Sequence, residues 1–266
     1  FSKKTDGFIS IFSWISIIGI TIGVAAVIIV MSVMNGFREE LTDRLLGING
    51  HLKIYSTNNE ITSNEFKLIN DKQLKEIIIS PSTQTQGLII SNESSKGVVL
   101  RGYNNKYLDK NHFLKNKITE GRIFENNLHD VVIGYALANQ LRMKINDKIK
   151  IAIPKSDNTI FGNIPRFKTL KIVGIFNLGM YEYDSNFIFT HQSIANKLLL
   201  LKDDHHNQVE FFVKNPEIIE DTQNLIDNII NENKLPFYTY SWKQNNSAII
   251  NALNVEKNVM FLILTL

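Results

Sequence analysis

The densest group of potential metal ligands in the sequence is Asp203, Asp204, His205 and His206, four adjacent residues just before a predicted strand. Carboxylate and imidazole groups bind zinc and related ions, but the ligands must be spaced so that several side chains can turn to one ion. Adjacent residues seldom do so, and such a cluster is more typical of a solvated turn. We therefore expect neither a metal ion nor another cofactor.

The sequence lacks the common signatures of catalysis. No stretch matches G-x-x-x-x-G-K-[ST], G-x-G-x-x-G, H-E-x-x-H or G-x-S-x-G, which rules out the usual phosphate-binding, zinc-protease and serine-hydrolase motifs. Cysteine is absent, which excludes disulfides, thiolate ligands and cysteine nucleophiles. An enzyme with an unrecognised site remains an alternative, but the sequence predicts a noncatalytic protein.

An apolar pair, Ile160 and Phe161, interrupts a polar stretch between two prolines, PKSDNTIFGNIP at residues 154–165. Each proline fixes its own φ and restricts the preceding residue, so both ends of the stretch are stiff. The stretch joins predicted strands at 148–153 and 169–176 as a long hairpin loop, whereas ordinary hairpins need two to five connecting residues. The excess length favours a binding function for this loop.

Three basic residues, Lys150, Arg166 and Lys168, flank the loop. They could form a basic pad, although lysines on an exposed strand are more often only solvated. Elsewhere the charges are interspersed, and the net charge of +3 from 29 basic and 26 acidic residues is small. Nucleic acid is therefore not an expected partner.

The elements that position this loop begin with a membrane helix. Residues 8–34 contain no charge, about 27 positions where roughly 20 cross a bilayer. This length excludes a cleaved signal peptide. Gly19, Gly23 and Ala26 recur on one helical face, where another helix could approach, although glycine is simply common in membrane helices.

The helical pattern continues beyond the apolar run. In NGFREELTDRLLG, apolar residues recur at Phe37, Leu41 and Leu45 as far as Gly47, so a helix over 8–46 would be roughly 58 Å long. Residues 1–47 are therefore predicted as a span with an extramembrane stalk. Basic residues on both sides of the span leave its orientation open.

The middle of the chain is predicted as an α+β domain, in which short strands rich in Ile, Val and Phe alternate with helices. The clearest soluble helix starts with Asn215 as N-cap and Pro216 at its first position. Helices are also predicted at 72–79, 135–143 and 191–200, and strands at 51–55, 97–101, 130–133, 148–153, 169–176, 187–190 and 209–214. A second span begins near Val259 within 247–266, which indicates a piece of a longer membrane protein.

The span and its exit, ISIIGITIGVAAVIIVMSVMNGFREELTDRLLGINGH at 15–51 and above all MSVMNGF at 31–37, resemble the start of lipoprotein-releasing permeases of the LolC/LolE type. The resemblance covers the whole chain. It implies a noncatalytic permease subunit in the bacterial inner membrane, multi-pass, with a large periplasmic domain. It also implies that this domain is similar to that of macrolide-exporter permeases, with a membrane-proximal subdomain over 48–101 and 205–246 and a β-rich insertion over 102–204.

The resemblance also implies partners: a cytoplasmic ATPase subunit (LolD-like), a second permease subunit in a homodimer or heterodimer, a periplasmic lipoprotein carrier (LolA-like), the lipoprotein itself and membrane lipid. Residues 154–165 match the family's hook loop, which enters the carrier, and the flanking basic residues match its pad. The expected hook residues are Pro154, Asn158, Ile160, Phe161, Gly162, Ile164 and Pro165. The expected lipoprotein cavity on the first span comprises Val30, Met31, Met34, Phe37 and Leu41.

A hook favours a LolC-like or hybrid LolF-like subunit over a LolE-like one. Two other permease classes remain alternatives. A macrolide-exporter-like permease would use the hairpin tip to dock on a channel partner, but leaves MSVMNGF without explanation. A cell-division-type permease would signal to cell-wall hydrolases, and its smaller outer domain fits less well with roughly 200 residues here.

Overall fold

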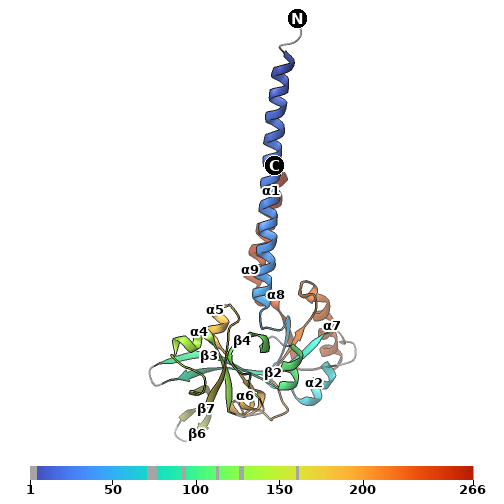
Figure 1. The fold of residues 1–266 in the computed structure, drawn as a ribbon. Coiled ribbons are helices and arrows are strands. Elements are labelled where there is room, and N and C mark those ends of the chain that lie inside the picture. The colour runs from blue at the N-terminus through green and yellow to red at the C-terminus, as the bar shows by residue number, and fades with distance from the viewer. Residues whose placement is uncertain are drawn as a thin grey trace. The chain divides into compact units, whose positions relative to one another are not determined.

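The structure is a computed structural model that describes residues 5–70, 77–91, 94–111, 114–125, 129–159 and 162–265. Its contacts divide the chain into two compact units, Phe1–Leu45 with Asn246–Leu266, and Leu46–Asn245. Figure 1 shows the elements of both units, coloured along the chain. The first unit is helical, and the second contains all the described strands.

The first unit consists of α1 (Thr5–Leu46) and α9 (Ser247–Thr265). Helix α1 is uninterrupted over 42 residues because it contains no proline, and it ends where Gly47 adopts φ +43°. Among the described residues, one helix is long and apolar enough to cross a bilayer, at Ile11–Leu46. The predicted continuation of the apolar helix as far as residue 46 is confirmed.

A polar contact joins the two helices of this unit. The Arg38 guanidinium donates from Nη2 to the backbone oxygen of Leu253, at 3.0 Å. Half-buried α1 residues one turn to either side of Arg38, Met34 and Leu41, lie on the same side of the helix. The Glu40–Arg44 pair at i,i+4 also forms, at 2.7 Å.

Six strands of the second unit close into a barrel. In ring order they are β2 (Ile78–Ile90), β3 (Ser95–Tyr103), β8 (Phe187–His191), β5 (Asp130–Gly134), β7 (Gly162–Phe176) and β6 (Lys148–Thr159). Each strand pairs with the next, and β6 pairs back onto β2. Because alternate side chains point inward, the barrel encloses a core that includes Ile89, Leu100, Val131, Ile151, Ile172 and Ile188.

Two short helices complete the barrel core. Helix α4 (Tyr135–Gln140) contributes Leu137 and Ala138, and α6 (Gln192–Leu199) contributes Ile194, Ala195 and Leu198. Outside the ring, β4 (Ile118–Gly121) pairs with the end of β7. The predicted helices at 135–143 and 191–200 are confirmed with shorter bounds.

Strand β2 also belongs to a second, open sheet. Its first residues pair with β9 (Gln208–Phe212), which pairs with β1 (Leu52–Ser56), which pairs with β10 (Phe237–Ser241), all antiparallel. Helix α7 (Ile219–Glu232) packs on β10 and contacts α2 (Ser63–Ile69). Within this unit, α2 and α7 lie at one side and α4 and α5 at the other (Figure 1). The proposed subdomain boundaries at 101/102 and 204/205 stay a prediction.

The predicted cap at Asn215 and Pro216 forms, but it starts a 3-10 turn, η3 (Pro216–Ile218), and α7 begins only at Ile219, after Ile218. In the turn, the Asn215 side chain accepts from the Glu217 backbone N–H at 3.1 Å. Proline is tolerated at the first position because its missing N–H has no partner within the helix. Short α8 (Trp242–Asn245) ends the unit.

A second apolar cluster packs on the outer surface of the barrel. It includes Leu108 of α3 (Asn105–Asn111) and Leu114, which directly precedes η2 (Lys115–Lys117), and Tyr183 of α5 (Tyr181–Asn186) packs against it. Its buried members are Ile48, Tyr103, Leu108, Leu114, Phe124, Val132, Val173, Phe176 and Phe189. Ile48 thus brings the segment after α1 into this cluster.

Three strands were not expected from the sequence, β2, β4 and β10. Strand β2 contains the polar run SPSTQTQG, and β10 alternates buried Phe237 with exposed Tyr238. The predicted helix at 72–79 is wrong at Ile78 and Ile79, which lie in β2, while residues 72–76 lie outside the described residues. Polar residues of β2 can lie within the sheet because neighbouring strands bond to them: Arg101 donates to the Gln84 side chain and Gln208 to the Ser82 hydroxyl.

Candidate functional site

The expected hook is a paired extension of two strands. Strands β6 and β7 continue through the stretch predicted as a loop, and Thr159 pairs with Gly162. The strand ends predicted at 153 and 169 are therefore wrong. About six further residues of β6 extend the arm by roughly 20 Å.

The pairing shifts register between Ile153 and Asp157. Three residues of β6, beginning with Pro154, lie opposite the single residue Pro165 of β7. Because proline has no backbone N–H, it cannot donate to a ladder, which explains why the interruption occurs here. Asn158 and Gly162 pair with their neighbours on the other strand, Ile164 pairs with Asp157, and Ile160 and Phe161 lie outside the described residues.

The structure separates the three residues of the expected basic pad. Arg166 and Lys168 pair with Ile153 and Ile151 and share their face of the hairpin. Arg166 donates from Nη1 to the Leu198 backbone oxygen of α6 at 3.1 Å. Lys150 points to the other face, where its ammonium lies 4.4 Å from the centre of the Phe167 ring. The contact between the Lys150 ammonium and the Phe167 ring is a cation–π interaction. Because Lys150 lies on one face of the hairpin and Arg166 and Lys168 on the other, the three residues do not form a pad on a single face.

The expected cavity residues lie on α1. Val30, Met34, Phe37 and Leu41 fall within about 60° of one another around the helix, whereas Met31 lies about 100° from Val30. Val30, Met31 and Phe37 are exposed, and Met34 and Leu41 are half-buried. A Cβ added at Gly19 or Gly23 would meet no atom of the described chain within 4 Å.

A buried charge cluster, which sequence reasoning missed, lies at the centre of the open sheet. Glu210 of β9 is fully buried and lies 3.3 Å from the Lys53 ammonium and 3.5 Å from the Arg101 guanidinium. It also accepts hydrogen bonds from Tyr103 Oη at 2.5 Å and from the Gly50 backbone N–H at 3.2 Å. Burial of these ions is tolerated because each charge has several partners.

The cluster shifts the titration of its members. Burial by itself raises the pKa of Glu210, but Arg101, Lys53 and the two hydrogen bonds hold that pKa below its usual value. Burial, followed by the positive charge of Arg101, lowers the pKa of Lys53 to about 8, although Glu210 opposes the shift. The pKa of Tyr103 is raised well above its usual value, first by burial and then by Glu210.

The segment that follows α1 is fixed by this cluster. The Asn49 carboxamide oxygen accepts from Lys53 Nζ and from Arg101 Nη2, both at 2.9 Å. Its amide nitrogen donates to Tyr183 Oη at 2.6 Å. A Cβ at Gly50 would lie 2.6 Å from the Glu210 Cβ, so the close approach of this backbone to β9 requires glycine. The sequence did contain a signal for this cluster, namely charged residues inside apolar strands: Arg101 within VVLRGY and Glu210 within VEFF.

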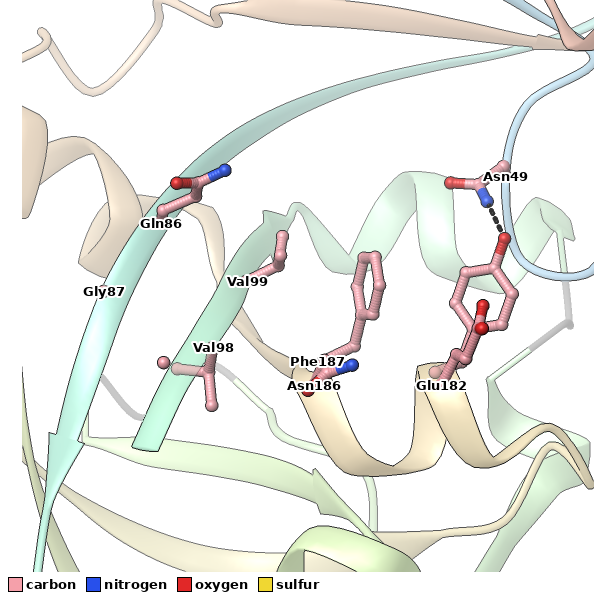
Figure 2. Close-up of a pocket in the computed structure, with 10 residues that line it drawn as sticks. Asn49, Gln86, Gly87, Val98, Val99, Glu182, Asn186 and Phe187 are labelled. Atoms are coloured by element: carbon pink, nitrogen blue, oxygen red, sulfur yellow. Dashed lines mark hydrogen bonds between the residues drawn. The ribbon is translucent and has the colours of Figure 1, made fainter. Parts of the chain in front are cut away.

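A pocket of about 610 Å³ opens beside Asn49 (Figure 2), within the range of about 300–1,000 Å³ that is usual for ligand sites. Apolar side chains of Val99 and Phe187 line it together with polar Gln86, Glu182 and Tyr183. Asn49, Gly87, Gly97, Val98 and Asn186 complete the lining. Asn49 donates a hydrogen bond to Tyr183 Oη within this lining, drawn as the dashed line in Figure 2.

The two histidines of the group at 203–206 make structural contacts. The His205 ring contacts the Glu60 carboxylate, and His206 packs edge-on against Phe66 at 5.6 Å between ring centres. Burial, and then the neighbouring His205, lower the pKa of His206 to about 4, so this ring is neutral at pH 7. Over the described ranges of the chain, no three His, Asp or Glu side chains are grouped as a metal site.

Comparison with known proteins places this architecture in a family. Residues 13–229 match the family described as MacB-like periplasmic core domain. The chain is 29% identical over 270 residues to the lipoprotein-releasing system transmembrane protein LolC of Neisseria meningitidis serogroup B, covering 100% of this chain and 64% of that protein. It is 24% identical to LolE of Haemophilus influenzae, covering 99% of this chain and 64% of that protein.

Among solved structures, the periplasmic region of MacB from Actinobacillus actinomycetemcomitans is similar, with 14% identity and a TM-score of 0.48, over 79% of this chain and 96% of that one. The chain spans somewhat less than two thirds of the length of the LolC relatives it matches. The family match covers more than half of this chain. The chain therefore belongs to the MacB-like periplasmic core domain family and is related within it to the permeases of the LolC/LolE type.

Proposed function

We propose that this chain is part of a permease subunit of an ABC-type lipoprotein-releasing complex in the bacterial inner membrane. The observation that supports this most directly is similarity along the whole chain to proteins named as lipoprotein-releasing transmembrane proteins. In this proposal α1 is the first span of a multi-pass protein, α9 begins the second, and Leu46–Asn245 lies in the periplasm.

The subunit itself carries out no chemical step. ATP hydrolysis belongs to a separate LolD-like subunit, and a second permease subunit completes a homodimer or heterodimer. Lipoprotein acyl chains enter from the membrane against the α1 face that carries Val30, Met34 and Phe37. Exposure of Val30 and Phe37 within the described unit supports the assignment, since a lipid-filled cavity provides these apolar side chains with an apolar environment.

The β6–β7 arm passes the lipoprotein to a LolA-like carrier. Its tip residues Ile160 and Phe161 would enter the carrier's apolar cavity, and Lys150, Arg166 and Lys168 would contact its rim. Burial of one such apolar side chain contributes about 1.5–3 kcal/mol before ordering costs, enough for a transient complex. The paired strands beneath the tip support the proposal because they keep the arm extended at low entropic cost.

The test is lipoprotein release by the full-length permease, assembled with its partner subunits in proteoliposomes and supplied with ATP and carrier. We expect Phe161→Asp to reduce transfer to the carrier by at least tenfold and to leave ATP hydrolysis unchanged. The matched control is Ile218→Asp, which places the same charge at an exposed apolar residue far along the chain.

Equal transfer by both variants would remove the hairpin tip from the delivery step. Absence of ATP-dependent lipoprotein release by the wild-type complex would instead contradict the permease assignment as a whole. An exporter-like permease that docks on a channel partner would then become the leading alternative.

A further inference from the structure

The pocket beside Asn49 has hydrogen-bonding capacity that the protein itself does not use. In the described part of the chain, neither Gln86, which is exposed, nor Asn186, which is half-buried, forms a side-chain hydrogen bond, although both line the pocket. Tyr183 Oη accepts from Asn49, which leaves its own proton free to be donated. The pocket therefore offers two carboxamides and a phenol to a ligand.

The chemistry of the lining selects one class of ligand. Two carboxamides can pair with peptide N–H and C=O groups at once, and the apolar surface of Val99 and Phe187 can cover a small side chain. None of the ten lining residues is lysine or arginine, so a phosphate headgroup would find no cation there. A bare acyl chain over the pocket would leave the half-buried Asn186 carboxamide unpaired, at a cost. An extended polypeptide meets all these requirements.

The position of the pocket in the chain indicates which polypeptide. Its wall includes Asn49, three residues after the end of α1, and Asn49 is held in place by Lys53 and Arg101. A lipoprotein whose acyl chains lie against α1 must send its polypeptide outward past the end of that helix. We propose that the pocket binds the first residues that follow the acylated end of the lipoprotein, an assignment that rests on the proposed function.

Gly97 provides a way to block the pocket without disturbing the fold. A Cβ added there would meet no atom of the described chain within 4 Å, and the residue lies in strand β3, where phenylalanine is well tolerated. Gly97→Phe therefore fills the pocket. Ser95→Phe is the matched control, because Ser95 is exposed on the same face of the same strand and does not line the pocket.

The experiment uses the full complex in proteoliposomes with two substrates, an intact lipoprotein and its acylated end with only one or two residues attached. We expect Gly97→Phe to raise the KM for the intact lipoprotein about tenfold and leave the short substrate and ATP hydrolysis unchanged. Ser95→Phe should behave as wild type. Equal impairment of both substrates, or of neither, would overturn the assignment.

A second measurement places the ligand directly. A photo-crosslinking residue introduced at Asn186 should join the intact lipoprotein within its first residues, identified by mass spectrometry. A crosslink to the second permease subunit instead would show that the pocket is a subunit contact and would overturn the proposal. A wild-type complex that releases neither substrate would refute the proposed function and this assignment together.

Discussion

Arg101 and Glu210 form an ion pair in which both side chains are almost completely buried, with Nη1 3.5 Å from Oε1. They come from β3 and β9, which lie on either side of β2. The pair therefore ties the barrel to the open sheet across the strand they share. Because Lys53 and Asn49 join the same cluster, it also fixes the segment that follows α1.

Replacement of Glu210 by Gln should destabilise Leu46–Asn245 severely. The change keeps the shape but leaves two buried cations without their anion, and such losses cost about 3–5 kcal/mol. Urea denaturation of the segment 46–245 measures the difference in the free energy of unfolding. Glu232→Gln, at an exposed residue, is the control and should change stability by less than about 0.5 kcal/mol. Equal stability of the two variants would contradict the role assigned to the cluster.

The lowered pKa of Lys53 predicts how stability depends on pH. Between pH 8 and about 10, the unfolded chain holds a proton on Lys53 that the folded chain has lost, so the free energy of unfolding should rise with pH. From pH 8 to 9.5 the gain is at most about 2 kcal/mol. Lys53→Met should remove this rise. The free energy of unfolding of both proteins is measured at pH 7.5 and 9.5. If it rises as much in the variant as in the wild type, the pH dependence belongs to another group.

Two glycines should respond in opposite ways to the same substitution. Gly50→Ala places a methyl group 2.6 Å from the Glu210 Cβ and should cost about 1–3 kcal/mol. Gly97→Ala meets open space in a strand and should be neutral or stabilising by about 0.5 kcal/mol. Thermal unfolding of the two variants, measured side by side, tests this. A larger loss of stability for Gly97→Ala than for Gly50→Ala would show that the backbone at Gly50 is not tightly packed against β9.

A carboxylate at Val30 should block lipoprotein entry. Val30→Asp adds a charge to the apolar face proposed for the acyl chains, and we expect at least a tenfold loss of release with carrier binding unchanged. Ile28→Asp is the control, because it places the same charge at a similar depth on the opposite side of α1. Both variants are compared at equal amounts of inserted protein. Similar activity of the two would remove the Val30 face from the path.

Sequence patterns were reliable wherever local chemistry determines structure. An uncharged run of this length must form a helix in a bilayer, and its amphipathic continuation carried the prediction correctly to Leu46. The capped turn that leads into α7 followed from Asn215 and Pro216, because capping depends on adjacent residues, although α7 itself begins only at Ile219. Most barrel strands were also predicted, because their Ile, Val and Phe content is a local sequence signal.

Only the tertiary structure decided the rest. Strand β2 is polar in sequence and is stabilised by bonds to distant residues, such as Gln84 to Arg101 and Ser82 to Gln208, which no local pattern encodes. The faces of the hairpin depend on register, which separates Lys150 from Arg166 and Lys168. The charge cluster and the pocket exist because Asn49, Arg101 and Glu210 meet from three segments, and long-range pairing alone brings those segments together.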